Sequence, residues 1–162
     1  MGSDVDLNAL LELATFGAAW AALAVGHNVA DHILSQGDHI ADNKGAPTVD
    51  EVTSGRKKSH YGWWENLQHV ALYHLVVATV LLITCWSFDL SATWRGVVAG
   101  LAWSATTHSF IDRRWPVRWI LRFTGSPGFA ELRSGGLNGI YLADQALHHG
   151  CLFISAIMIA KL

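Results

Sequence analysis

The stretch from Val70 to Trp86 reads VALYHLVVATVLLITCW and contains no charged residue. Its few polar side chains are too sparse to form the water-facing stripe that a soluble amphipathic helix needs. Similar apolar runs cover approximately residues 7–33, 67–88, 92–111 and 139–160, and each approaches the roughly 20 residues of a membrane-spanning helix. The sequence therefore predicts an all-α integral membrane protein, a four-helix bundle in a single domain over residues 1–162.

The overall composition agrees with a membrane protein. Hydrophobic residues make up 51% of the 162-residue chain, charged residues only 15%, and the mean hydropathy is +0.27. Soluble domains carry about 25% charged residues, so a soluble four-helix bundle is the weaker alternative. The net charge of −2 argues against nucleic-acid binding, which needs a dense basic surface. Cys85 and Cys151 lie in apolar runs and imply no disulfide framework.

The basic residues predict how the chain is oriented. Nine of the eleven lie in two long loops: Lys44, Arg56, Lys57 and Lys58 in residues 36–62, and Arg113, Arg114, Arg118, Arg122 and Arg133 in residues 113–138. Loops rich in Lys and Arg stay on the cytoplasmic side. We therefore expect a multi-pass protein of the cytoplasmic (inner) membrane with both termini outside and both long loops inside. The loops should be largely irregular, with at most one short surface helix in the second.

The predicted spans also contain ionisable side chains, which are rare in membranes and mark functional sites by default. Three pairs of His and Asp are spaced four residues apart, so that both members of a pair share one helix face. The predicted cluster has seven members: His27, Asp31, His69, His108, Asp112, Asp144 and His148. In the predicted topology all of them lie in the cytoplasmic half of the membrane, and helical bundles often hold metals between facing helices.

Imidazole and carboxylate together suit a divalent transition metal. We expect one or two ions, with zinc favoured over iron or manganese. A bound metal lowers the pKa of its coordinated water to about 7 and supports hydrolysis. The sequence thus predicts a metal-dependent hydrolase acting on an amphiphilic lipid or phosphoester at the cytoplasmic leaflet, with Asp144 as a ligand or as the general base.

Several alternatives stay open at this point. The cluster could form a metal-ion or proton path in a transporter or channel subunit, or the chain could be a non-catalytic membrane adaptor. His and Asp could also pair with each other across the helices without any metal, although such hydrogen bonds average only about 0.6 kcal/mol in measured membrane proteins. Membrane lipid is the expected partner, with an anionic head group near Arg113 and Arg114. Gly96 and Gly100 would allow close helix contact within one chain or in a homo-oligomer.

Four segments carry a resemblance to a known family. They are GHNVADHILSQGDHIADNKG (residues 26–45), LQHVALYH (67–74), THSFIDRR (107–114) and LADQALHH (142–149). In this order and spacing they resemble the small polytopic membrane proteins of bacteria and phages grouped as domain of unknown function 3307. The resemblance implies a polytopic membrane fold and matches His27, Asp31, Lys44, His69, His108, Asp112, Asp144, Gln145 and His148 to the family pattern. The chain departs from that pattern at His32 and Gln36. A weaker likeness is to membrane-bound metal-dependent hydrolases.

Overall fold

The computed structural model describes residues 6–34 and 37–162 and is almost entirely helical within them. Its four long helices are α1 (Leu7–Val29), α4 (Trp63–Phe88), α5 (Trp94–Asp112) and α7 (Gly139–Lys161). A π-helical turn, η1 (Ala30–Leu34), extends α1. Side chains cap the starts of three of the four long helices, with Asp6 on α1, Thr93 on α5 and Asn138 on α7, and each accepts a hydrogen bond from the first turn. The all-α prediction is confirmed.

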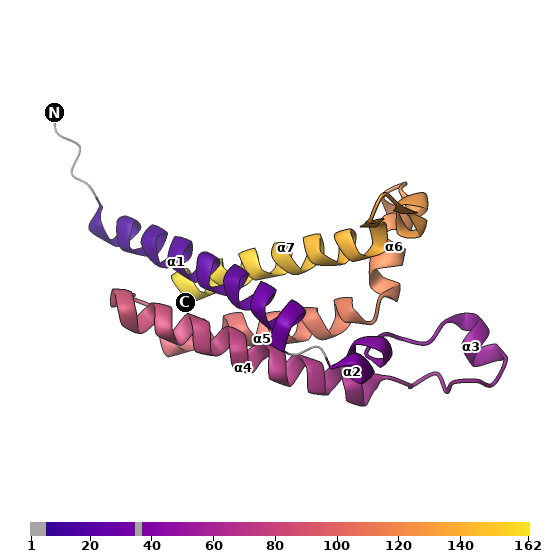
Figure 1. Ribbon diagram of the computed structural model, residues 1–162. Coiled ribbons are helices and arrows are strands. Elements are labelled where there is room, and N and C mark those ends of the chain that lie inside the picture. The colour runs from indigo at the N-terminus through magenta and orange to yellow at the C-terminus, as the bar shows by residue number, and fades with distance from the viewer. Residues whose placement is uncertain (1–5, 35–36) are drawn as a thin grey trace.

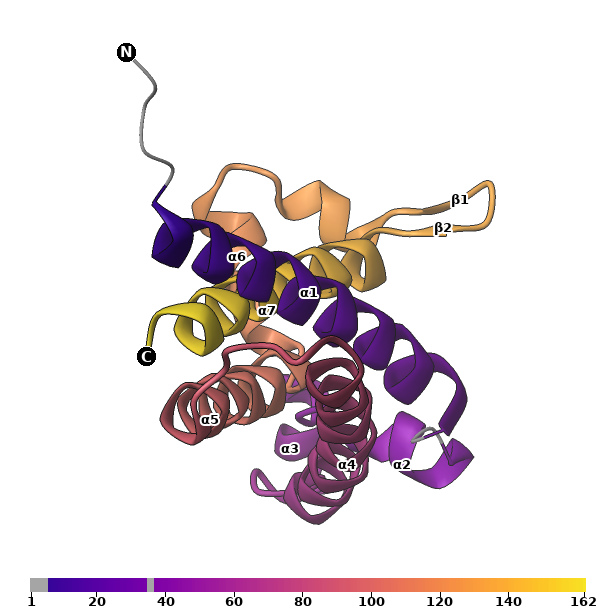
Figure 2. The same cartoon turned by 90° about the vertical axis from the view of Figure 1, so that its left-hand side faces the viewer.

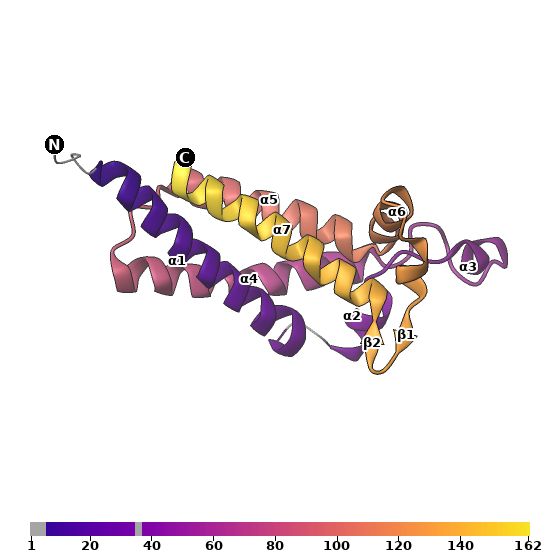
Figure 3. The same ribbon diagram turned by 90° about the horizontal axis from the view of Figure 1, so that it is seen from above.

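The four long helices pack in a closed cycle. α1 contacts α4 and α7, and α5 contacts the same two helices from the other side. Figures 1 and 3 show the start of α1 and the end of α7 at one end of the molecule, and the two long connections at the other. The chain therefore alternates in direction between successive long helices, as the sequence predicts.

The two connections contain more local structure than expected. The first forms α2 (Asp38–Asn43) and α3 (Val49–Thr53), and the second forms α6 (Trp115–Phe123) and a 3₁₀ helix, η2 (Pro127–Glu131). Two short antiparallel strands, β1 (Arg133–Ser134) and β2 (Leu137–Asn138), make a hairpin that projects from the helices in Figure 2. A capping box between Thr48 and Glu51 explains α3. Gln36, where the family pattern is displaced, lies outside the described residues.

The contact between α5 and α7 depends on small residues. A Cβ atom added at Gly100 would lie 2.9 Å from the backbone oxygen of Ser155 and 2.9 Å from Ile159 Cγ1. The Ser155 hydroxyl donates a hydrogen bond of 3.0 Å to the Gly100 oxygen. The small residues of α5 therefore permit close packing against α7 within the chain.

The surface of the long helices is strongly apolar. Three helical segments are long and apolar enough to cross a membrane: Leu7–Leu34, Trp63–Phe88 and Gly139–Lys161. α5, which corresponds to the predicted span 92–111, is not among these candidates in the described part of the chain. Large apolar side chains such as Leu75, Leu82 and Ile157 are exposed, whereas Asn66 and several histidines are buried. A protein of this kind is suited to a lipid environment.

Candidate metal centre

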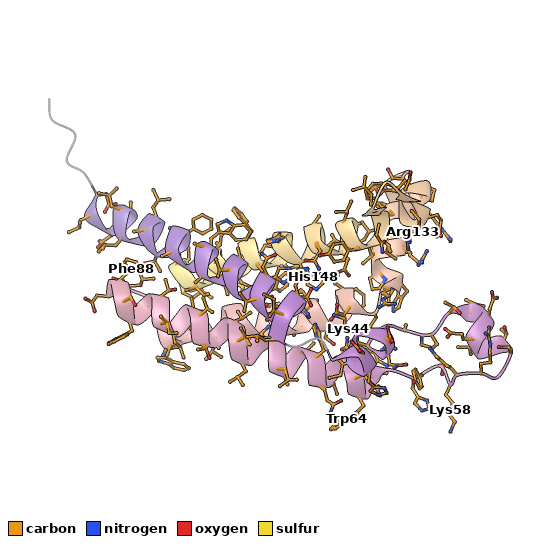
Figure 4. The ribbon with its side chains drawn as sticks, in the orientation of Figure 1. Lys44, Lys58, Trp64, Phe88, Arg133 and His148 are labelled. Carbon is orange, nitrogen blue, oxygen red and sulfur yellow. The ribbon has the colours of Figure 1, made fainter. Side chains whose placement is uncertain are left out.

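A cluster of buried His and Asp side chains lies between the long helices. His69 comes from α4, His108 and Asp112 from α5, His148 from α7 and Asp31 from η1, and none is more than 5% exposed. Figure 4 shows His148 between the helices, with Lys44 toward the connecting loops and Phe88 at the opposite end. The cluster therefore lies toward the end of the molecule that carries the long loops, as predicted.

Two groups of three buried side chains, called the first and second triads, share His108 and are close enough together to hold a metal ion. The first consists of Asp31, His69 and His108, and the second of His108, Asp112 and His148; in each, one potential ligand atom per residue lies within 4.8 Å of the others. His69 Nε2 is 3.1 Å from Asp31 Oδ1 and 3.0 Å from His108 Nε2. His108 Nε2 is 3.2 Å from Asp112 Oδ2. The structure thus brings together five of the seven predicted ligands.

Lys44 enters this cluster from the loop side. Its Nζ lies 3.0 Å from His69 Nε2, 3.4 Å from Asp31 Oδ1 and 3.1 Å from Asp112 Oδ2. The ammonium group is nearly buried, and it balances part of the charge of the two carboxylates. Because the ammonium group lies against two members of the first triad and against Asp112 of the second, it would compete with a metal ion most strongly at the first triad.

Arg113 holds the segment around Lys44 in place. Its Nη1 donates 3.0 Å to the Lys44 carbonyl and its Nη2 donates 2.7 Å to the Tyr61 carbonyl, while the guanidinium lies 4.5 Å from the centre of the Trp63 ring. Burial lowers the pKa of Arg113, and nearby Glu65 opposes that shift. Arg113 therefore positions Lys44, and its side chain is directed at backbone carbonyls.

The second triad shows the better fit to a metal ion. His148 Nδ1 lies 2.9 Å from the Asp144 carbonyl oxygen, which can only accept, so Nδ1 carries the proton. In the neutral ring the lone pair is then on His148 Nε2, which is buried and has no hydrogen-bond partner among the described residues. His108 Nδ1 and Asp112 Oδ2 also lack one in the described chain, although Asp112 Oδ2 lies at ion-pair distance from its basic neighbours. Histidine ligands of metals commonly donate their other ring N–H to a carbonyl in this way.

His27 lies beside the triads. Its Nδ1 is 3.0 Å from the Tyr73 hydroxyl, and its Nε2 is 2.9 Å from Gln145 Oε1, so both ring nitrogens have protein partners. Gln145 Nε2 in turn donates 3.0 Å to Asp31 Oδ2. The π-helical turn separates His27 from Asp31, and its wider turn changes the angle between the two side chains. His27 and Gln145 therefore orient Asp31 in this structure.

Asp144, the seventh predicted residue, lies at the edge of the cluster. Its Oδ2 is 3.3 Å from His148 Nδ1 and also accepts a 3.3 Å hydrogen bond from Gln145. Asp144 lines a pocket of about 320 Å³ that also reaches Asp31, Lys44 and Asp112. This pocket gives the cluster an opening to the loop end of the molecule.

Two neighbours of the triads, Tyr73 and Lys44, are not among the ligands predicted from the spacing of His and Asp. Tyr73 is fully buried, and its ring centre lies 4.0 Å from that of His108. It follows His69 by four residues, so the same spacing rule that found the His/Asp pairs would have found it. Lys44 has no such signal beyond the family pattern. His74, five residues after His69, lies off the face that His69 and Tyr73 share, and its ring contacts the Ser104 hydroxyl and the Val70 carbonyl.

Comparisons of the chain with protein-family models, with curated proteins and with solved structures give no match.

Proposed function

We propose that this protein is a membrane-embedded metal protein that hydrolyses an amphiphilic substrate. The observation that carries the proposal is the second triad, His108, Asp112 and His148. A backbone carbonyl accepts the Nδ1 proton of His148, and the buried His148 Nε2 and His108 Nδ1 lack hydrogen-bond partners among the described residues. Unsatisfied buried polar atoms are costly, and a metal ion would satisfy them.

Zinc is the favoured ion, with iron or manganese as alternatives, because imidazole and carboxylate ligands suit all three. One ion is placed at the second triad because that triad contains the buried His148 Nε2, which lacks a hydrogen-bond partner among the described residues, whereas Lys44 lies against two of the three members of the first. Lys44 is also 3.1 Å from Asp112 Oδ2, so its ammonium group would have to move when Asp112 binds the ion. A second ion at Asp31 and His69 would require the ammonium group to move away. His27 would then act through Gln145 on Asp31.

The membrane arrangement is part of the proposal. We infer that α1, α4, α5 and α7 form a four-helix bundle that crosses the cytoplasmic membrane, with both termini outside. The exposed apolar surface of the long helices and the concentration of Lys and Arg at the loop end support it. α5 is the least apolar of the four, but it carries two triad residues and packs against two neighbours. We also propose that the chain belongs to the domain of unknown function 3307 family.

The pocket favours hydrolysis over transport. It connects the cluster to the loop end, whereas on the far side the core is mostly apolar, including Leu23, Val77 and Leu81, with Ser104 and Ser155 as buried hydroxyl groups that hydrogen-bond within the bundle. Bound metal would supply Lewis acidity and an activated water. Asp144, on the pocket wall beside His148, would accept the proton of the attacking water, and Gln145 would hold the Asp144 carboxylate in place.

A hydrolysis assay on the full chain tests this function. Purified protein loaded with zinc, iron or manganese is mixed with vesicles of a mixed phospholipid extract, and products are detected by mass spectrometry. Asp144→Asn should keep its metal and lose at least about 100-fold in rate, because general-base catalysis contributes about 10²- to 10⁴-fold. Asp38→Asn, an exposed carboxylate in α2, is the matched control and should leave the rate unchanged. Product formation that does not depend on metal, or none at all, contradicts the hydrolase.

A further inference from the structure

The pocket beside the cluster has two charge layers. Asp31 and Asp112 lie on its inner side, and three arginines, Arg114, Arg118 and Arg133, line its outer part. They come from the N-cap of α6, from α6 itself and from β1. Side chains from η1, α5, α6 and β1 therefore converge on one pocket. Figure 4 shows Arg133 at the loop end of the molecule.

The arginines keep hydrogen-bonding capacity for a ligand. Arg114 Nη2 donates 3.2 Å to the Ala41 carbonyl, and Arg118 Nη1 lies 2.5 Å from Glu131 Oε1. Arg133 Nη1 donates to the carbonyls of Leu132 and Ala130. A guanidinium has five N–H donors, and each of these contacts uses a single nitrogen. Arginine also matches phosphate oxygens in pairs, which a lysine does not.

The position of Arg114 is specifically built. Arg114 has φ of 66°, a conformation that L-residues other than glycine seldom adopt and that tends to occur at functional sites. Its side chain lies across Gly45, where an added Cβ would be 3.1 Å from Arg114 Cδ and from Nε. The strained backbone of Arg114 and the absence of a side chain at Gly45 together place the Arg114 guanidinium at the pocket.

The face of α6 next to these arginines is aromatic and exposed. Trp115, Trp119 and Phe123 follow one another at four-residue spacing, and the rings of Trp119 and Phe123 stack with their centres 5.5 Å apart. Exposed tryptophan is typical of the level where membrane meets water. An aromatic face beside an arginine face places the outer part of the pocket at the depth of lipid head groups.

We propose that this pocket binds the phosphate-bearing head group of an anionic phospholipid, with Arg114, Arg118 and Arg133 contacting the phosphate oxygens. This assignment rests on the proposed function, because it makes a phospholipid the substrate that reaches the metal triad. It assigns the head-group contact expected near Arg113 and Arg114 to Arg114, since the Arg113 guanidinium is directed at backbone carbonyls.

The test measures binding, so it does not depend on hydrolysis. Zinc-loaded and zinc-free full-length protein in detergent is titrated calorimetrically with dihexanoyl phosphatidic acid, dihexanoyl phosphatidylcholine and inorganic phosphate. Arg114→Gln and Arg118→Gln should each weaken binding of the phosphatidic acid by about tenfold or more, because each loses a hydrogen bond between charged groups. Arg122→Gln is the matched control, since Arg122 lies on the same exposed helix outside the pocket, and it should change the affinity less than about twofold.

Three results would overturn the assignment. Equal weakening by Arg122→Gln would mean that overall charge, and not the pocket, attracts the lipid. Inorganic phosphate binding as tightly as phosphatidic acid would assign the pocket to a soluble phosphate compound. If Arg114→Gln and Arg118→Gln keep their metal and bind phosphatidic acid as tightly as wild type, the head-group site is contradicted. The metal centre is not affected by that result. Absence of metal from every sample would instead contradict the proposed function, while the zinc-free titrations still test the arginines.

Discussion

Lys44 is the residue that decides how the buried charges are balanced. Its ammonium group lies within 3.4 Å of side-chain atoms of Asp31, His69 and Asp112, and its own segment is held by Arg113. Two carboxylates in the same buried region need a cation nearby, because an uncompensated buried charge costs about 3 to 5 kcal/mol. In the absence of metal, Lys44 is that cation.

We therefore expect opposite effects of Lys44→Met on stability and on metal affinity. Without metal, the variant should unfold with a free energy lower by about 3 kcal/mol. Its affinity for zinc should rise by about tenfold or more, because a positive charge beside the ligands repels the ion. Thermal unfolding and zinc titration of the detergent-purified protein measure both. Lys58→Met, in the same loop but exposed, is the control; a variant that binds zinc more weakly than wild type would contradict this role.

At the residue scale, much of the candidate site could be predicted from spacing. Residues four apart on a helix share a face, and this rule alone identifies Asp112 with His108 and Asp144 with His148. It holds less well for His27 and Asp31, because a π-helical turn begins between them. Lys44 could not be placed by any local rule, since it reaches the cluster only when its loop folds back over the helix ends.

At the scale of elements, the long helices were predictable and the connections were not. The four apolar runs match α1 with η1, α4, α5 and α7 to within four residues at every end. Long apolar runs determine their own conformation, because every backbone group must be hydrogen-bonded inside lipid. Short elements depend on single caps, such as the Thr48–Glu51 capping box of α3, and are easily missed.

The contact between α5 and α7 gives a test at this scale. Gly100→Ala should lower the free energy of unfolding by about 1 to 3 kcal/mol, because the new Cβ meets the backbone of α7. Gly150→Ala is the matched control: it lies within α7 with nothing within 4 Å of its added Cβ, and it should not destabilise. Thermal unfolding in detergent compares the two. Equal midpoints would show that α5 and α7 are not closely packed there.

At the scale of the whole molecule, the charge distribution predicts one orientation. Nine of the eleven basic residues lie in the two connections at the loop end of the structure. In a background of Cys85→Ala and Cys151→Ala, we expect Ser59→Cys and Ser134→Cys to react with a membrane-impermeant thiol reagent only from the cytoplasmic side. Ser91→Cys, in the short connection between α4 and α5, should react only from outside. The reverse pattern would contradict the proposed orientation.

The most direct test of the account is the metal content of the detergent-purified protein, measured by plasma mass spectrometry after reconstitution with zinc, iron or manganese. We predict about one equivalent in wild type, none in His148→Ala, and an unchanged amount in His39→Ala, whose exposed ring pairs with Glu65. His27→Ala should also keep its metal, because His27 acts through Gln145 on Asp31 and orients no member of the second triad. No metal in wild type, or the same amount in His148→Ala, would contradict the metal centre.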